Sequence, residues 1–283
     1  MSEPERQKVT APWVRSRKRR QGADPVVWVT AYDEPWARLV DRAGVDVILV
    51  GDTLAEIVLG YEDTLHVDVD VMAHHVAAVA RARPRALVVG DMPWMSYHLE
   101  PSDAVRNAAR LVRAGAGAVK LEGGHQRLGA VEAILAAEIP VIGHLGLTPQ
   151  SVHAMGGYRV QGRQVEAAAR LVEDARLLSD AGCTAVVLEG VPDVVAERIT
   201  AEIAAPTIGI GAGAACDGQV LVLHDLLGMT ARTPPKFVRR YADVGQVVVD
   251  AVSRYCDDVR ASRFPAEEET YHGSADLRRA LGG

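Results

Sequence analysis

Apolar positions along the chain follow two periods, which alternate from residue 26 onward. Short runs rich in Val, Ile and Leu predict strands that are buried on both faces. These runs are Val26–Thr30, Val45–Gly51, Ala86–Gly90, Ala118–Leu121, Pro140–Gly143, Thr184–Leu188, Pro206–Ile210 and Val220–His224. Other segments repeat apolar residues at helical spacing and predict helices. These segments are Glu34–Ala43, Val71–Arg83, Asp103–Ala114, Leu128–Ala137, Val165–Ala181, Val194–Ala204 and Val244–Val259.

The order of these elements indicates an α/β fold with a parallel sheet. Strands that alternate with helices form either a closed (β/α)8 barrel, the TIM barrel, or an open doubly wound sheet. Polar residues at the ends of many separate strands favour closure, because a barrel brings all these ends to one rim. We therefore predict the barrel, with the doubly wound sheet as the alternative. The weakest point is the connection between strands seven and eight, which leaves room only for a very short helix.

The predicted elements form one large domain between two polar ends. We predict a polar leader over residues 1–22, a barrel domain over residues 23–265 and a polar tail over residues 266–283. The leader contains the basic run Arg15–Arg20. Such a run can bind nucleic acid or direct targeting, but it more often is a solvated surface segment, which is our expectation here.

Composition narrows the classes of function. The 283 residues are 48% hydrophobic, which is ample for the single core of a barrel. A net charge of −6 and only 5% aromatic residues argue against a nucleic-acid surface. No apolar stretch approaches the ~20 residues of a membrane span, and the N-terminus lacks the order of a secretory signal. The widely spaced cysteines fit neither a disulfide framework nor a zinc site, so we expect a cytoplasmic protein with neither nucleic acid nor membrane as partner.

Acidic side chains come directly after several predicted strands. They are Asp52, Asp91, Glu122 and Glu189. An aspartate at such a junction often caps the next helix, which is the simplest explanation for any one of them. The four together instead indicate an oxygen-rich metal centre, because Mg²⁺ prefers carboxylates and retained water. Asp52 and Asp91 are the candidate ligands, and Glu122 either ligates the ion or orients a metal-bound water.

Two basic residues join the four acids at the predicted rim, and Glu189 is assigned a separate role. Lys120 precedes Glu122 by two residues, so both side chains point to one face of the strand. Lys120 could pair with the carboxylates, hold a substrate carboxylate or form a Schiff base, and the metal-type carboxylates make the last role less attractive. His144 either donates to a substrate oxygen or is structural. Glu189, distant in sequence from the two aspartates, is the best candidate for a base that does not ligate metal.

An ordered set of motifs resembles one enzyme family. The motifs are Thr30–Asp33, Val50–Thr53, Asp91–Pro93, Val119–Gly124, Gly143–Ser151, Gly156–Tyr158, Gln161–Arg163, Gly209–Gly213 and Asp217–Leu221. They are similar to those of the ketopantoate hydroxymethyltransferase family, over about residues 26–265. The run Gly143–Ser151 is highly specific. The resemblance implies a barrel of the phosphoenolpyruvate/pyruvate-binding type, usually assembled as a homodecamer.

The resemblance also implies a reaction. A hydroxymethyl group would pass from 5,10-methylenetetrahydrofolate to 3-methyl-2-oxobutanoate through a Mg-stabilised enolate, giving 2-dehydropantoate for pantothenate and coenzyme A biosynthesis. By motif position, Asp52 and Asp91 would bind Mg²⁺ and, through it, the keto acid. Glu122 would lie in or just outside the coordination sphere. Thr53 and Lys120 would hold the keto acid directly.

The remaining catalytic candidates are Glu189, which the resemblance implies as proton acceptor, and His144. The chain departs from the family pattern at three single positions and in the segment Arg81–Arg85. Thr53 stands where serine is usual, His66 where proline is usual, and Gly190 where cysteine often follows the catalytic glutamate. These changes concern substrate preference and loop dynamics more than reaction class. The alternatives are a Mg-dependent lyase acting on another 2-oxo acid and a paralogue that binds a keto acid without turnover.

Overall fold

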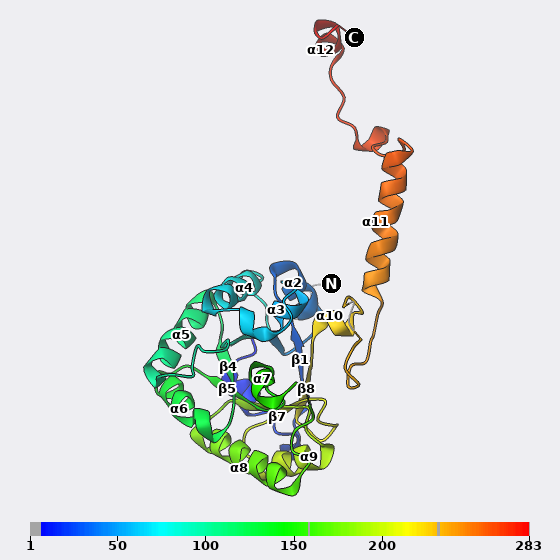
Figure 1. The fold of residues 1–283 in the computed structure, drawn as a ribbon. Helices are drawn as coiled ribbons and strands as arrows, with labels where there is room; N and C mark the ends of the chain where they lie inside the picture. The colour runs from blue at the N-terminus through cyan, green and yellow to red at the C-terminus, as the bar shows by residue number, and fades with distance from the viewer. Residues whose placement is uncertain (1–6, 158, 231–232, 283) are drawn as a thin grey trace.

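The computed structural model describes residues 7–157, 159–230 and 233–282. Within them, eight parallel strands close into a barrel in sequence order, with β8 paired to β1 (Figure 1). The strands are β1 (Val26–Thr30), β2 (Val47–Val50), β3 (Leu87–Asp91), β4 (Ala118–Glu122), β5 (Val141–Gly146), β6 (Ala185–Glu189), β7 (Thr207–Ile210) and β8 (Gly218–Leu221). The predicted (β/α)8 barrel is confirmed, and the doubly wound alternative is wrong.

Helices surround the barrel, and the predicted ones begin and end within about two residues of the sequence-based bounds. The longer helices are α2 (Glu34–Ala43), α4 (Val69–Arg81), α5 (Pro101–Ala114), α6 (Leu128–Ala136), α8 (Val165–Ala181), α9 (Asp193–Glu202) and α11 (Val244–Arg260). The short ones are α1 (Ala11–Arg15), α3 (Leu54–Ile57), α7 (Val152–Met155), α10 (Leu223–Leu226) and α12 (Ala275–Ala280). Single 3₁₀ turns lie at Arg19–Gln21, Thr64–His66, His125–Arg127, Pro149–Ser151 and Glu267–Glu269.

The last strand begins earlier than its apolar run predicts. The prediction was Val220–His224, whereas β8 begins at Gly218, which pairs with β1 and β7. A side chain at Gly218 would meet the backbone oxygen of Val26 at 2.4 Å, so only glycine allows this close pairing. His224 lies in α10 instead. In the described residues 211–217 between β7 and β8 there is no helix, so the expected short helix is absent there.

The barrel interior is apolar at one end and polar at the other. Inward side chains recur every second residue along each strand. At the N-terminal ends of the strands they form one apolar cluster, which includes Trp28, Val89, Ile142 and Val187. Two residues beyond each of these four, the side chain is polar: Thr30, Asp91, His144 and Glu189. This alternation places the polar residues at the C-terminal rim, where barrel enzymes carry their active sites.

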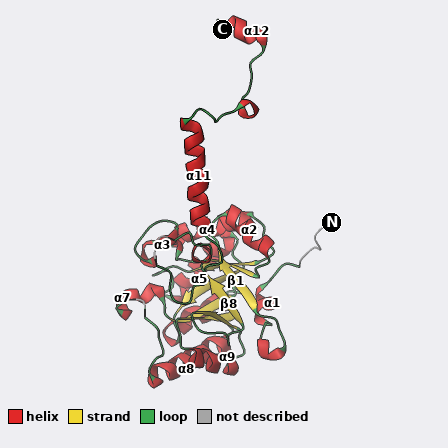
Figure 2. Ribbon diagram, turned by 90° about the vertical axis from the view of Figure 1, so that its right-hand side faces the viewer, coloured by secondary structure: helices red, strands yellow, loops and turns green. Residues whose placement is uncertain are grey.

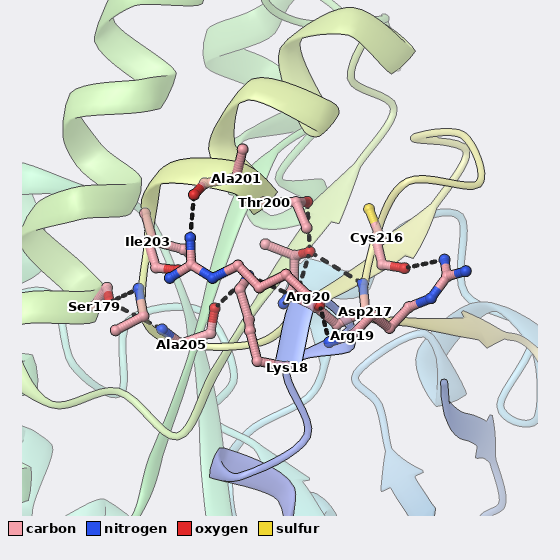
Figure 3. A network of polar contacts seen from close by, with 12 residues as sticks. Lys18, Arg19, Arg20, Ser179, Thr200, Ala201, Ile203, Ala205, Cys216 and Asp217 are labelled. Atoms are coloured by element: carbon pink, nitrogen blue, oxygen red, sulfur yellow. Dashed lines mark hydrogen bonds and ion pairs between the residues drawn. The ribbon is translucent and has the colours of Figure 1, made fainter. Parts of the chain in front are cut away.

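The N-terminal segment closes the opposite end of the barrel. Val9 and Val14 belong to the same apolar cluster as the inward strand residues. Lys18 is 1% exposed, and its ammonium group lies 2.7 Å from the Asp217 carboxylate, just before β8 (Figure 3). The expectation of a solvated leader is therefore wrong for these residues. A basic run looks the same in sequence whether its charges face water or a distant carboxylate.

The C-terminal helix α11 extends away from the barrel, and α12 lies farther out still (Figures 1 and 2). Four side chains spaced along α11 are about half exposed: Val248, Val252, Tyr255 and Val259. They recur at helical spacing and form one apolar stripe, which we call the α11 stripe. In the described part of the chain no helix has the length and apolar character needed to cross a membrane. The predicted domain limits at residues 22 and 265 stay predictions.

Candidate active site

All the predicted site residues border one cavity at the C-terminal rim of the barrel. The cavity has a volume of about 950 Å³. Its lining includes Asp52, Thr53, Asp91, Lys120, Glu122, His144 and Glu189. These residues come from β2 to β6 or the turns that follow, so the closure of the barrel brings them together.

The acidic residues at this rim are not helix caps. The N-cap positions of the elements that follow them are instead Thr53, Glu100, Gly124 and Pro192. Elsewhere aspartates do cap helices, because Asp33 accepts a hydrogen bond from the Trp36 N–H and Asp68 accepts one from the Val71 N–H. The structural explanation for the four strand-end carboxylates is therefore excluded, and their burial needs another reason.

Asp52 and Asp91 lie side by side. The Asp52 N–H donates to Asp91 Oδ2 at 3.0 Å, and Asp91 Oδ1 lies 2.9 Å from Lys120 Nζ. Burial, followed by the negative charges of Asp91 and Glu122, raises the pKa of Asp52 well above its usual value. Burial also raises the pKa of Asp91, although the Lys120 ammonium opposes this. A bound cation would offset the cost of burying the Asp52 and Asp91 carboxylates and the repulsion between them.

Lys120 is held in its charged form. Burial lowers its pKa, but the charges of Asp91, Glu122 and Asp52 outweigh burial and raise the pKa above the usual value. A Schiff-base lysine must be a neutral amine to attack a carbonyl. The structure therefore disfavours that role and leaves Lys120 as a fixed positive charge beside the carboxylates.

His144 lies between two carboxylates. Its Nδ1 is 3.3 Å from Glu122 Oε1, and its Nε2 is 3.2 Å from Glu189 Oε2. Burial and the Lys120 charge lower the pKa of His144, but the contacts with Glu122 and Glu189 outweigh them and raise it to about 9. The imidazole lies between Glu189 and the carboxylate cluster. Its predicted part in catalysis stays untested.

Tyr32, to which the sequence assigned no role, positions Thr53. The Tyr32 hydroxyl and Thr53 Oγ1 lie 3.0 Å apart, which links the end of β1 to the turn after β2. Gly51 leaves room for this arrangement. A Cβ added there would be 3.1 Å from Thr53 Oγ1 and 3.4 Å from Asp91 Oδ2. An alanine would therefore crowd both the hydroxyl and the carboxylate.

Two further buried residues of the site, Gln150 and Tyr97, were not predicted from the sequence. Gln150 Nε2 donates to Asp52 Oδ2 at 2.8 Å, and the Tyr97 hydroxyl donates to Gln150 Oε1 at 2.6 Å. Gln150 lies within the motif Gly143–Ser151, which marked its position without a role. Nothing in sequence marks Tyr97, whose contact with Gln150 spans 53 residues.

The donor set fits Mg²⁺ better than a softer ion, because its charged ligands are all oxygen. Glu122 Oε1 and Asp91 Oδ1 are buried without a hydrogen-bond partner, although each lies near a basic group. No three His, Cys, Asp or Glu side chains among the described residues form a ready-made metal cage. Two carboxylates with water and substrate oxygens would complete the coordination that Mg²⁺ usually takes, which favours Glu122 as an outer group.

Comparisons with known proteins identify relatives of the whole chain. A family model described as ketopantoate hydroxymethyltransferase matches residues 8–267. The 3-methyl-2-oxobutanoate hydroxymethyltransferase of Koribacter versatilis (strain Ellin345) is 52% identical over 98% of this chain and 93% of its own length. The enzyme of that name from Methylobacterium sp. (strain 4-46) is 57% identical over 90% of this chain and 89% of its own length.

Solved structures with the same fold are more distant in sequence. A phosphonopyruvate hydrolase matches with a TM-score of 0.60 and 12% identity, over 98% of this chain and 95% of that chain. A 2,3-dimethylmalate lyase, described as a PEP mutase/isocitrate lyase superfamily member, matches with a TM-score of 0.59 and 18% identity, over 97% and 95% of the two chains. These likenesses confirm the barrel fold.

Proposed function

The chain belongs to the ketopantoate hydroxymethyltransferase family and is a hydroxymethyltransferase, and we propose that it acts on 3-methyl-2-oxobutanoate with 5,10-methylenetetrahydrofolate as donor and Mg²⁺ as cofactor. The product would be 2-dehydropantoate. One observation carries the proposal: His144 separates Glu189 from the other carboxylates within a single cavity. The site thus offers acids for a cation and a separate base for a substrate proton.

Asp52 and Asp91 would hold the Mg²⁺ ion, with Glu122 orienting a bound water. When bound, the ion supplies Lewis-acid stabilisation for negative charge on the keto oxygen. Lys120 places a second positive charge beside Asp91, where it can bind the carboxylate of the keto acid. The Thr53 hydroxyl, aligned by Tyr32, is a hydrogen-bond donor for the same substrate.

Glu189 would accept the proton from C3 of the keto acid. Its Oε2 lies 3.2 Å from His144 Nε2, a contact that holds the carboxylate at the cavity wall. The new C–C bond then forms between C3 and the one-carbon unit. Both bonds from that carbon to the two folate nitrogens break in turn. Water supplies the hydroxyl of the product, and the two nitrogens end with the C3 proton and the remaining water proton, which gives tetrahydrofolate. The Lys120 ammonium would stabilise the negative charge that develops on the substrate.

The size of the cavity supports a second, larger substrate. A volume of about 950 Å³ lies near the top of the range for ligand pockets, far more than such a small keto acid requires. Leu147, Val160 and Phe237 provide apolar wall, and Arg159 and Lys236 add positive charge. Apolar wall suits a pterin ring, and cationic side chains suit the glutamate carboxylates of a folate.

Self-association into a homodecamer is part of the proposal. The α11 stripe leaves Val252 and Tyr255 more than half exposed, at 53% and 54%, on a helix that extends away from its own barrel. Exposed apolar side chains in one row are typical of a protein interface. A cytoplasmic location likewise stays a prediction from sequence.

The direct test is product formation. Purified protein with Mg²⁺, 5,10-methylenetetrahydrofolate and 3-methyl-2-oxobutanoate should form 2-dehydropantoate, and omission of the folate should abolish it. EDTA should stop the reaction, and added Mg²⁺ should restore it. Cleavage of another 2-oxo acid without folate-dependent product would favour the lyase alternative. Binding of the keto acid without any turnover would favour a non-catalytic paralogue.

A further inference from the structure

Gln150 connects the loops that follow four consecutive strands. Its side-chain Nε2 donates to Asp52 Oδ2 after β2 at 2.8 Å and to the Met92 carbonyl after β3 at 3.0 Å. Its backbone N–H donates to Glu122 Oε2 at the end of β4 at 3.0 Å. Gln150 itself lies in the turn after β5 and is 5% exposed. One residue therefore contacts two carboxylates of the candidate metal centre.

The orientation of the Gln150 amide is fixed by groups whose hydrogen-bonding role is unambiguous. The Glu122 N–H can only donate, and it donates to the Tyr97 hydroxyl oxygen at 3.1 Å. The hydroxyl proton is then free to donate to Gln150 Oε1 at 2.6 Å. The Met92 carbonyl can only accept, so it requires the NH₂ side of the amide. Both constraints turn the NH₂ group toward Asp52 Oδ2.

We propose that Gln150, oriented by Tyr97, is a positioning residue that fixes the Asp52 and Glu122 carboxylates for Mg²⁺. This inference rests on the metal site of the proposed function. Oδ2 of Asp52 and Oε2 of Glu122 each accept a hydrogen bond from Gln150, so the other oxygen of each carboxylate would remain for the ion or a water bound to it. Hydrogen bonds to ligating carboxylates set ligand orientation, and their loss typically lowers metal affinity by about 10–100-fold.

The test compares three variants in the full chain. Gln150→Met removes the amide at similar volume and keeps the backbone N–H to Glu122. Tyr97→Phe removes the hydroxyl that orients the amide and accepts from the Glu122 N–H, and it leaves Gln150 in place, so it reports on the proposal even if the first variant folds poorly. Gln164→Met is the matched control, because Gln164 is exposed ahead of α8 and makes no capping hydrogen bond.

Mg²⁺ affinity is measured by calorimetry with saturating 3-methyl-2-oxobutanoate, and Mn²⁺ is titrated by electron paramagnetic resonance as a spectroscopic check. We expect about tenfold or more weaker Mg²⁺ binding in Gln150→Met and a smaller loss in Tyr97→Phe, with the control unchanged. Excess Mg²⁺ should restore much of kcat in both. Wild-type affinity in both variants, with only a lower melting temperature, would overturn the positioning role. Failure of the wild-type protein to bind Mg²⁺ would overturn the metal site itself and this role with it.

Discussion

Replacing Lys18 by methionine tests how firmly the N-terminal segment closes the barrel. Lys18 Nζ lies 2.7 Å from Asp217 Oδ2, and both side chains are 1% exposed (Figure 3). Methionine keeps most of the apolar stem but removes the charge. Asp217 then stays buried without its partner, and the loss of one member of a buried ion pair typically costs about 3–5 kcal/mol.

The remaining contacts of Asp217 place the expected cost at the lower end of that range. The carboxylate still accepts from the Arg19 N–H at 2.8 Å and the Thr207 N–H at 2.9 Å. Hydrogen bonds to a charged group offset part of its desolvation. We therefore expect the free energy of local opening of residues 7–22 to fall by about 3 kcal/mol. Because about 1.4 kcal/mol corresponds to a tenfold change, amide protection there should fall by about 100-fold.

Hydrogen exchange of peptides from this segment measures the effect directly, since it reports local opening rather than global unfolding. The double variant Lys18→Met/Asp217→Asn should lower the free energy of local opening by less than the sum of the two single variants, because it leaves no unpaired charge. Arg106→Met, which removes an exposed ion pair with Asp103, is the control and should leave the protection unchanged. Protection within twofold of wild type in Lys18→Met would refute the argument that this buried pair anchors the segment.

Two other outcomes follow from the candidate site and from α11. Asp52→Ala should weaken Mg²⁺-dependent binding of 3-methyl-2-oxobutanoate in calorimetry. The control Asp68→Ala should lower the free energy of unfolding by about 1 kcal/mol, because it removes a helix cap, and should leave binding of the keto acid intact. Equal binding of the keto acid by both variants would contradict the role of Asp52 as a metal ligand. Val252→Asp should reduce the assembly size in analytical ultracentrifugation, and Ser253→Asp on the neighbouring face of α11 should not. An unchanged size in Val252→Asp would remove the α11 stripe from the interface.

The strand-end carboxylates could be predicted because their signal is local. A charge directly after a run of buried residues is unusual wherever it occurs, and Asp91, Glu122 and Glu189 each end such a run. The barrel brings these ends together without any further information about side chains. The sequence could therefore place the acids, the lysine and the histidine at one rim, and the cavity contains them all.

The residues that orient these acids could not be predicted in the same way. Gln150 and Tyr97 lie in turns, where polar residues are common, and their partners are 25 to 98 residues away in sequence. Lys18 was assigned to a solvated run because its carboxylate partner is 199 residues distant. The start of β8 was missed because a glycine that permits close strand pairing carries no apolar signal. Contacts of this kind depend on the closed barrel.

Proton exchange at C3 of 3-methyl-2-oxobutanoate in D₂O tests the central claim most directly, because it isolates the base from the folate step. The wild-type protein with Mg²⁺ should exchange this proton. Glu189→Gln should bind Mg²⁺ and the keto acid with nearly wild-type affinity in calorimetry, yet lose the exchange. Exchange at the wild-type rate in Glu189→Gln would contradict the account, since the proton would then leave to a group other than Glu189.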